Sequence, residues 1–257
     1  MRTESIQQFV DFAQVLADTG AKIIRREFRM SADYIVKEDQ SPVTKVDQDV
    51  EATQRKLILS HFPNHGILGE EFGHENPDSE YTWLLDPIDG TKAFAAGLNS
   101  FASLITLARN GKPIIGIIDQ PITNERWIGV EGRPTTFNGR NIRTRKCEHL
   151  KQAVLATCSP DNYNQEGKKA YRALNNATRW TVYGASCLAP GMLASGFIDI
   201  VIEAGLDPYD YCPIVPIIEG AGGVITDLEG APLTIKSGEY MLASCTKQLH
   251  EKALNTI

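Results

Sequence analysis

Two aspartates, three residues apart, carry the clearest chemical signal in the chain. Asp86 and Asp89 close an apolar run in the segment LLDPIDGT (84–91). Two carboxylates held close together repel each other unless a positive charge lies between them. Mg²⁺ takes oxygen ligands, and the Ile88 carbonyl adds a third oxygen between the two aspartates. The segment predicts a metal site, although a turn followed by a helix cap explains these eight residues equally well.

Gly90 and Thr91 extend this prediction to an anion. They open the short helical segment TKAFAAG (91–97), whose first N–H groups would point at a phosphate. Glycine permits close approach of the backbone, and the Thr91 hydroxyl could hold a water molecule. Phosphatases that attack through an aspartyl nucleophile place their two aspartates two residues apart. The spacing of three argues against a covalent aspartyl phosphate.

Other acidic residues also lie where an apolar segment meets a polar turn, namely Asp47, Glu70 and Asp210. An α/β sheet presents its active site at such strand ends. We therefore expect these carboxylates to gather with Asp86 and Asp89.

Composition excludes several classes of partner. The chain has 257 residues and a formal net charge of -6, which argues against a nucleic-acid or anionic-membrane surface. No apolar run reaches the length of a membrane span or of a signal-peptide core. The five cysteines are scattered, without a CxxC pair, which is typical of free thiols in a reducing compartment. These features predict a cytoplasmic protein.

The elements that must position the carboxylates follow from periodicity. Apolar residues at helical spacing predict a long helix over 6–28, and a second helix follows the loop that begins at residue 37. Residues 81–86 are typical of a strand, and 101–130 of a strand meander with a hairpin at Asn110-Gly111. After about residue 150, strands at 153–159, 197–205 and 240–245 alternate with helices at 167–177, 187–196, 210–223 and 246–257.

This order predicts a layered mixed α/β fold, in which a meander precedes alternating units. We expect a single domain over 1–257, with an N-terminal half of about 1–145 and a C-terminal half of about 146–257. Within the helix over 210–223, Pro213 fits the first turn, whereas Pro216 predicts a bend.

Three blocks resemble the inositol-monophosphatase-like superfamily of Mg²⁺-dependent phosphatases. They are GEEF (69–72), WLLDPIDGTKAF (83–94) and the Asp-led helix that ends in EGAGG (219–223). Their order and spacing fit over essentially the whole chain. The resemblance implies the layered α-β-α-β-α sandwich of the sugar phosphatases, two or three Mg²⁺ ions per site and a homodimer. It also implies in-line attack by an activated water on a phosphomonoester, without a phosphoenzyme.

The resemblance assigns roles position by position. The implied metal ligands are Glu70, Asp86, the Ile88 carbonyl, Asp89 and Asp210. The implied water-activating residues are Glu70, Asp47 and Thr91. Phosphate would be held by the backbone of Gly90 and Thr91. Residues implied on the substrate side are Asp89, Ser186, Glu203 and Asp207.

Smaller blocks look like the histidinol-phosphate phosphatases of this fold, a branch that acts in histidine biosynthesis. These blocks are IIDQP with NERW (117–127) and EAGLDPYDYCPIVPIIEGAGG (203–223). The chain departs from that branch at GASCL (184–188), where G-G-D-C-Y is common, so Ser186 replaces a carboxylate and Leu188 a tyrosine. Inositol phosphates, sugar phosphates or a phosphoadenosine nucleotide are the alternative substrates. A non-catalytic member is disfavoured, because every metal and water-activating position is present.

Overall fold

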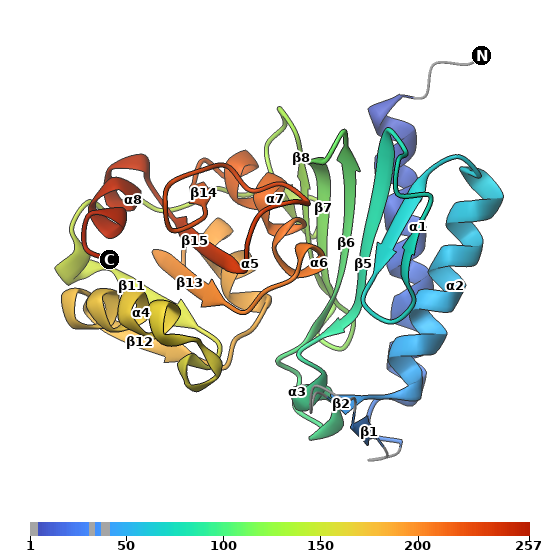
Figure 1. The fold of residues 1–257 in the computed structure, drawn as a ribbon, viewed down its shortest axis with the longest axis horizontal. Coiled ribbons are helices and arrows are strands. Elements are labelled where there is room, and N and C mark those ends of the chain that lie inside the picture. The colour runs from blue at the N-terminus through green and yellow to red at the C-terminus, as the bar shows by residue number, and fades with distance from the viewer. Residues whose placement is uncertain (1–4, 31–33, 37–41) are drawn as a thin grey trace.

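The computed structural model describes residues 5–30, 34–36 and 42–257, and within these ranges the chain forms five layers (Figure 1). Helices α1 and α2 form one outer layer and cover the first sheet. Helices α5, α6 and α7 lie between the first and the second sheet, and α4 and α8 form the other outer layer. The α-β-α-β-α order expected from the sequence is confirmed.

The first outer layer consists of α1 (Ile6–Glu27) and α2 (Lys45–His61). Ser5 and Thr44 cap these helices through capping boxes, which satisfy N–H groups that a helix start leaves unpaired. The apolar face of α1 packs on β6 and β7, and α2 packs on β5. Both helices expected from the sequence are present.

The first sheet contains eight of the described strands, in the order β10-β9-β8-β7-β6-β5-β3-β4. Its central strands are β5 (Tyr81–Asp89), β6 (Ala102–Arg109), β7 (Lys112–Gln120) and β8 (Glu125–Val130). The others are β3 (Gly66–Gly69), β4 (Gly73–Glu75), β9 (Thr136–Phe137) and β10 (Arg140–Asn141). The predicted hairpin is confirmed, because Asn110 and Gly111 both have positive φ between β6 and β7. A separate hairpin pairs β1 (Ile35–Val36) with β2 (Pro42–Val43).

The middle layer comprises α5 (Leu188–Ala194), α6 (Pro208–Tyr211) and α7 (Ile214–Gly220). Two glycines of the first sheet let α7 approach closely. A Cβ on Gly116 would lie 1.9 Å from the carbonyl oxygen of Pro213, and one on Gly129 would lie 2.3 Å from the backbone nitrogen of Ile217. The backbone of the α7 segment therefore rests directly on β7 and β8.

The second sheet has the order β12-β11-β13-β15-β14. Its strands are β11 (Val154–Thr157), β12 (Trp180–Tyr183), β13 (Ile200–Ala204), β14 (Val224–Thr226) and β15 (Tyr240–Ser244). Strand β11 runs parallel to both neighbours, and β15 antiparallel to both of its own. Helices α4 (Gln165–Ala177) and α8 (Lys247–Leu254) pack on β13 and β15.

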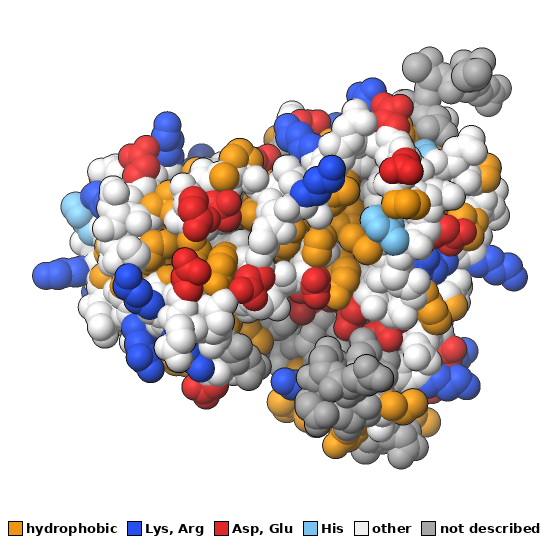
Figure 2. Space-filling view, in the orientation of Figure 1, with side chains coloured by type: hydrophobic (Ala, Val, Ile, Leu, Met, Phe, Trp, Pro, Cys, Tyr) orange, Lys and Arg blue, Asp and Glu red, His pale blue; other side chains and the backbone are white. Residues whose placement is uncertain are grey.

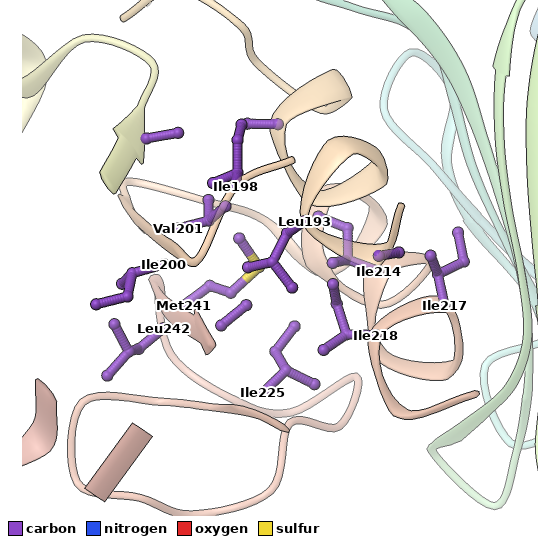
Figure 3. Close-up of a cluster of buried hydrophobic side chains, with 14 of the residues drawn as sticks. Leu193, Ile198, Ile200, Val201, Ile214, Ile217, Ile218, Ile225, Met241 and Leu242 are labelled. Carbon is purple, nitrogen blue, oxygen red and sulfur yellow. The ribbon is translucent and has the colours of Figure 1, made fainter. Parts of the chain in front are cut away.

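Buried aliphatic side chains join the second sheet to the middle layer. Figure 3 shows Leu193 of α5 and Ile214 and Ile218 of α7 directed toward Val201 and Met241 of the sheet. The middle layer and the second sheet thus share one continuous hydrophobic core. Among the described residues, no helix combines the length and hydrophobicity that crossing a bilayer requires.

The structure differs from the local predictions in two places. The expected helix over 210–223 is divided into α6 and α7, and the break falls at Cys212-Pro213, not at Pro216. Pro216 is the third residue of α7, where a backbone N–H has no partner within the helix, so its ring is accommodated without a bend. Strand β12 was not predicted, because its exposed edge position gives no alternation of apolar and polar residues.

Candidate metal centre and active site

The end of β5 explains how Asp86 and Asp89 point to the same side. In a regular strand, residues three apart face opposite sides of the sheet. Asp86 pairs with Leu104 and Asp89 with Ala102, so β5 holds one residue more than β6 over this interval. The resulting bulge reverses the alternation, and Pro87 within it has no N–H to lose from the ladder. The D-P-x-D spacing is therefore the spacing of a bulged strand end.

Asp210 reaches the same place from the C-terminal half. It lies in α6, whose start is fixed by a capping box in which the Asp207 N–H donates to Asp210 Oδ2 at 2.8 Å. One carboxylate oxygen from each of Asp86, Asp89 and Asp210 lies within 4.8 Å of the others. Each half of the chain thus contributes carboxylates to a single cluster.

Among the described residues, the charges that act most strongly on the cluster are those of other carboxylates. Burial first, and then the charges of Glu70 and Asp89, raise the pKa of Asp86 well above its usual range. Burial followed by the charge of Asp89 raises the pKa of Asp210 in the same direction. Oδ1 of Asp86 is buried without a hydrogen-bond partner among the described residues. A buried acceptor in a field of like charges fits a hard divalent cation, which prefers carboxylate oxygens.

A cleft of about 750 Å³ opens over the cluster. Within the described part of the chain, five carboxylates and one lysine, Lys92, line it; the carboxylates belong to Glu70, Asp86, Asp89, Asp207 and Asp210. Acidic side chains run across the middle of this face of the molecule, near the junction of the two halves (Figure 2). Cations bound in the cluster would offset this negative charge and so favour the binding of an anion in the cleft.

Gly90 and Thr91 form one wall of the cleft and lead into α3 (Thr91–Ala95). Gly90 has φ 90°, and an added Cβ would lie 2.9 Å from the carbonyl oxygen of Ser100, so a larger residue would be both strained and crowded. The Thr91 hydroxyl donates to the Ile88 carbonyl at 3.0 Å, which leaves that oxygen a second lone pair.

Asp47 and Glu70 lie at different depths. Glu70 lines the cleft, whereas Asp47 is fully buried and is not among the lining residues. The Thr44 N–H and hydroxyl both donate to Oδ2 of Asp47, and Oδ1 has no partner among the described residues. Burial raises the pKa of Asp47 to about 6, more than the bonds from Thr44 lower it. An unpartnered carboxylate oxygen with a pKa near neutrality suits a proton acceptor.

A smaller pocket of about 210 Å³ adjoins the cleft and shares Asp89 and Ser186 with it. Glu203 of β13 lies in its wall and accepts hydrogen bonds from the Cys158 N–H at 2.7 Å and from the Tyr163 hydroxyl. The Ser186 hydroxyl and the Cys187 N–H both donate to Oδ2 of Asp89.

The structure thus brings most of the expected site residues into two connected cavities. Asp207 is exposed at the cleft, where its Oδ2 accepts from the Tyr209 hydroxyl at 2.9 Å. Sequence reasoning missed Tyr163 and Cys158, the partners of Glu203, because their contacts join separate elements. Lys37, near which the superfamily has a basic residue, lies outside the described residues.

We expect the Glu203→Gln substitution to weaken the pH dependence of stability in the metal-free protein. Burial raises the pKa of Glu203 from its ordinary 4.5 to about 8, so the folded state binds a proton that the unfolded state has released between these values. Stability should therefore fall as the pH rises through this window. Glutamine cannot ionise and removes this contribution. Urea unfolding in the presence of a chelator, repeated across this pH window, measures the free energy of unfolding against pH. The exposed Glu148→Gln is the control. Equal slopes in the natural protein, Glu203→Gln and Glu148→Gln would contradict the prediction.

The layered fold and the carboxylate cluster between its halves define the class of metal-dependent phosphatases of the α-β-α-β-α type. Comparison with known proteins agrees: the model of the inositol monophosphatase family matches residues 5–257. The chain belongs to the inositol monophosphatase family and is a phosphomonoester hydrolase.

The relatives carry names of both specificities. The chain is 42% identical to "Bifunctional phosphatase IMPL2, chloroplastic" of Arabidopsis thaliana, with 98% of this chain and 75% of the relative covered. It is 31% identical to the histidinol-phosphatase of Mycobacterium tuberculosis, with 85% and 86% covered. The solved structure of an inositol monophosphatase from Zymomonas mobilis superposes with a TM-score of 0.90 at 41% identity, over 99% of both chains.

Proposed function

We propose that the protein hydrolyses histidinol phosphate to histidinol and phosphate, with inositol 1-phosphate or another sugar or nucleotide phosphomonoester as the alternative substrate. The observation that supports this choice is the small pocket beside the carboxylate cluster. It combines apolar walls, including Leu104, Ile214 and Met241, with the buried carboxylate of Glu203. An imidazole ring suits the apolar walls, and an ammonium group bound beside Glu203 would favour the ionised form of its side chain. The relative named histidinol-phosphatase supports the same choice.

In this proposal, the metal site comprises Glu70, Asp86, Asp89, Asp210 and the Ile88 carbonyl, and it would hold two or three Mg²⁺ ions. Bound Mg²⁺ would neutralise the phosphate charge and lower the pKa of a water molecule. The backbone N–H groups of Gly90 and Thr91 would hold the phosphate at the start of α3.

The chain's own residues would then move the proton. Thr91 and Glu70, both in the cleft wall, orient the attacking water. Asp47 does not line the cleft, so the proton would reach its Oδ1 by way of a lining residue; Thr44 already occupies Oδ2. On the leaving-group side, Glu203 and Asp207 would face the substrate ammonium, and Ser186 would keep Asp89 oriented. Homodimerisation and a cytoplasmic location remain predictions.

The direct test measures phosphate release from histidinol phosphate, inositol 1-phosphate and a phosphoadenosine nucleotide, with Mg²⁺ present or chelated. We expect Mg²⁺-dependent release, fastest from histidinol phosphate. Preference for inositol 1-phosphate would support the alternative, and no release from any ester with Mg²⁺ present would contradict both.

Ser186→Asp provides a sharper test of the leaving group. The new carboxylate would replace a hydroxyl that donates to Asp89, so two like charges would meet beside the pocket. A substrate ammonium relieves that repulsion, whereas an uncharged inositol ring does not. We therefore expect the ratio of kcat/KM for histidinol phosphate over inositol 1-phosphate to rise about tenfold, the effect of a coupling of about 1.4 kcal/mol. The control is Ser186→Asn, because asparagine has the shape of the introduced aspartate without its charge. If the ratio of kcat/KM values is equal in Ser186→Asp and Ser186→Asn, the substrate ammonium lies elsewhere.

A further inference from the structure

A buried carboxylate outside the cleft contacts the segment that carries Glu70. Glu51 lies on α2, one turn after Asp47, and its side chain is fully buried. It does not line the cleft and does not belong to the cluster of Asp86, Asp89 and Asp210. The reaction described above assigns it no role.

Glu51 accepts hydrogen bonds from the backbone immediately after Glu70. The Glu71 N–H donates to Oε2 at 2.8 Å, and the Phe72 N–H donates to Oε1 at 3.2 Å. The Glu70 N–H itself donates to the carbonyl oxygen of Leu85, the residue before Asp86, at 3.1 Å. Three consecutive N–H groups are therefore fixed, one by β5 and two by Glu51. Their positions set the direction in which the Glu70 side chain leaves the backbone.

The surroundings of Glu51 keep its carboxylate in this place. Nε of Arg55 donates to Oε1 at 2.7 Å, and another Arg55 nitrogen donates to the Gly73 carbonyl beyond the turn. A Cβ on Gly69 would lie 1.9 Å from Oε1 of Glu51, so the glycine before Glu70 leaves the space that the carboxylate fills. A buried charge with one close cationic partner and two backbone donors is held firmly.

We infer that Glu51 is a positioning residue, which aims the Glu70 carboxylate at the metal cluster by holding the turn 70–72. This inference rests on the metal site proposed above. It also explains why one helix carries both Asp47 and Glu51. A rigid α2 fixes the relative placement of the proposed proton acceptor and of the Glu70 ligand. Glu51 itself contacts neither metal nor substrate in this arrangement.

Glutamine cannot replace Glu51 in this role. The three groups that Glu51 accepts from, two backbone N–H groups and the Arg55 guanidinium, are all donors. A glutamine offers one acceptor oxygen, and its NH₂ would face a donor. The turn would loosen while the volume of the side chain stays the same.

The test is Mg²⁺ binding by calorimetry to the full-length Glu51→Gln protein, at a temperature where circular dichroism shows it folded. We expect the Kd for Mg²⁺ to rise about tenfold, the low end of effects seen when residues that orient a metal ligand are removed. The Mg²⁺ concentration for half-maximal phosphate release should shift equally, and kcat should recover at saturating Mg²⁺. The exposed Asp49→Asn on the same helix removes one negative charge without touching the turn, and it should leave the Kd unchanged.

Two further variants separate the possible failures. Arg55→Lys keeps the positive charge but loses the Nε bond to Glu51, so it should also raise the Kd for Mg²⁺. If Glu51→Gln does not fold, the Kd of Arg55→Lys tests the positioning role of Glu51. Asp86→Asn tests the site itself: wild-type Mg²⁺ affinity in this variant would overturn the proposed metal site and the inference with it. Suppose that Asp86→Asn loses Mg²⁺ binding but the folded Glu51→Gln protein keeps wild-type affinity. The metal site then stands, and only the positioning role of Glu51 is overturned. Arg55→Lys takes the place of Glu51→Gln in this comparison if Glu51→Gln does not fold. The positioning role is also overturned if activity falls with no change in the Kd.

Discussion

Asp86→Asn is expected to abolish Mg²⁺-dependent phosphate release and, at the same time, to stabilise the metal-free protein. A metal ion contributes several kcal/mol to the stabilisation of transition-state charge. Each 1.36 kcal/mol corresponds to a tenfold change in rate, so the loss should be on the order of 10³-fold. Asparagine keeps the shape of the side chain but removes the charge that the cation would neutralise.

The gain in stability has a separate cause. Asp86 is buried beside other carboxylates, and its Oδ1 lacks a hydrogen-bond partner among the described residues. Asparagine removes the repulsion between the ionised form of Asp86 and the neighbouring carboxylates, and its NH₂ can donate to those carboxylates, a hydrogen bond to a charged group that contributes about 1.5–3 kcal/mol. We therefore expect the free energy of unfolding in the presence of a chelator to rise by about 1 kcal/mol or more. Mg²⁺ should stabilise the natural protein and leave Asp86→Asn unaffected.

Urea unfolding with chelator and with Mg²⁺, together with phosphate release on the same samples, measures both effects. The control is Asp49→Asn, which removes a charge from an exposed position. Near-normal turnover by a folded Asp86→Asn protein would refute the metal-site proposal. A loss of stability in the metal-free variant would show instead that the ionised carboxylate supports the fold.

Gly116→Ala is expected to have the largest effect on stability. The added Cβ would lie 1.9 Å from the carbonyl oxygen of Pro213, 2.7 Å from its carbonyl carbon and 2.9 Å from its Cα. All three atoms belong to the backbone, so no side-chain rotation can relieve the contact. Overpacking of this kind costs about 3 kcal/mol when the backbone must move. Pro213 follows Asp210 by three residues, so the shift should also move a carboxylate of the cluster.

Chemical denaturation and Mg²⁺ calorimetry test this prediction together. We expect a lower free energy of unfolding and, in any protein that still folds, a higher Kd for Mg²⁺. Gly238→Ala is the matched control, because a Cβ there would meet nothing within 4 Å. If the Gly116→Ala protein is as stable as the Gly238→Ala protein, the close approach of α7 to β7 is contradicted.

Much of the fold could be predicted from the sequence, because its signals are local. The apolar spacing of α1, the Asn110-Gly111 turn and the strand–helix alternation of the second half each lie within one stretch of chain. The break between α6 and α7 was misplaced, because a proline is tolerated in a first turn, and only the fold decides where that turn begins. Strand β12 was missed because an exposed edge strand carries no burial pattern.

Part of the candidate site could likewise be predicted from local sequence, and part of it depends on the fold. The block around Asp86 and Asp89 can be found from its spacing, whereas the bulge that turns both side chains to one side depends on the pairing with β6. The sequence of α2 was interpreted through four apolar residues, Val46, Val50, Leu57 and Ile58; Val50 and Ile58 are fully buried, whereas Val46 and Leu57 are partly buried. Asp47, Glu51 and Arg55 are buried on the same helix, although charged residues at helical spacing usually mark a solvent-exposed face. Burial of a charge depends on partners far along the chain.

Asp86 and Asp89 precede Asp210 by about half the length of the chain, and this order matters during synthesis. A ribosome makes the protein from the N-terminus, and β5 with its two aspartates emerges well before α6. Until the later segment has emerged and docked on the first sheet, the nascent chain lacks the third carboxylate of the cluster. Phosphatase activity should therefore appear only after Asp210 has been synthesised and has docked, and a chain truncated before residue 208 should release no phosphate even if its first sheet has formed.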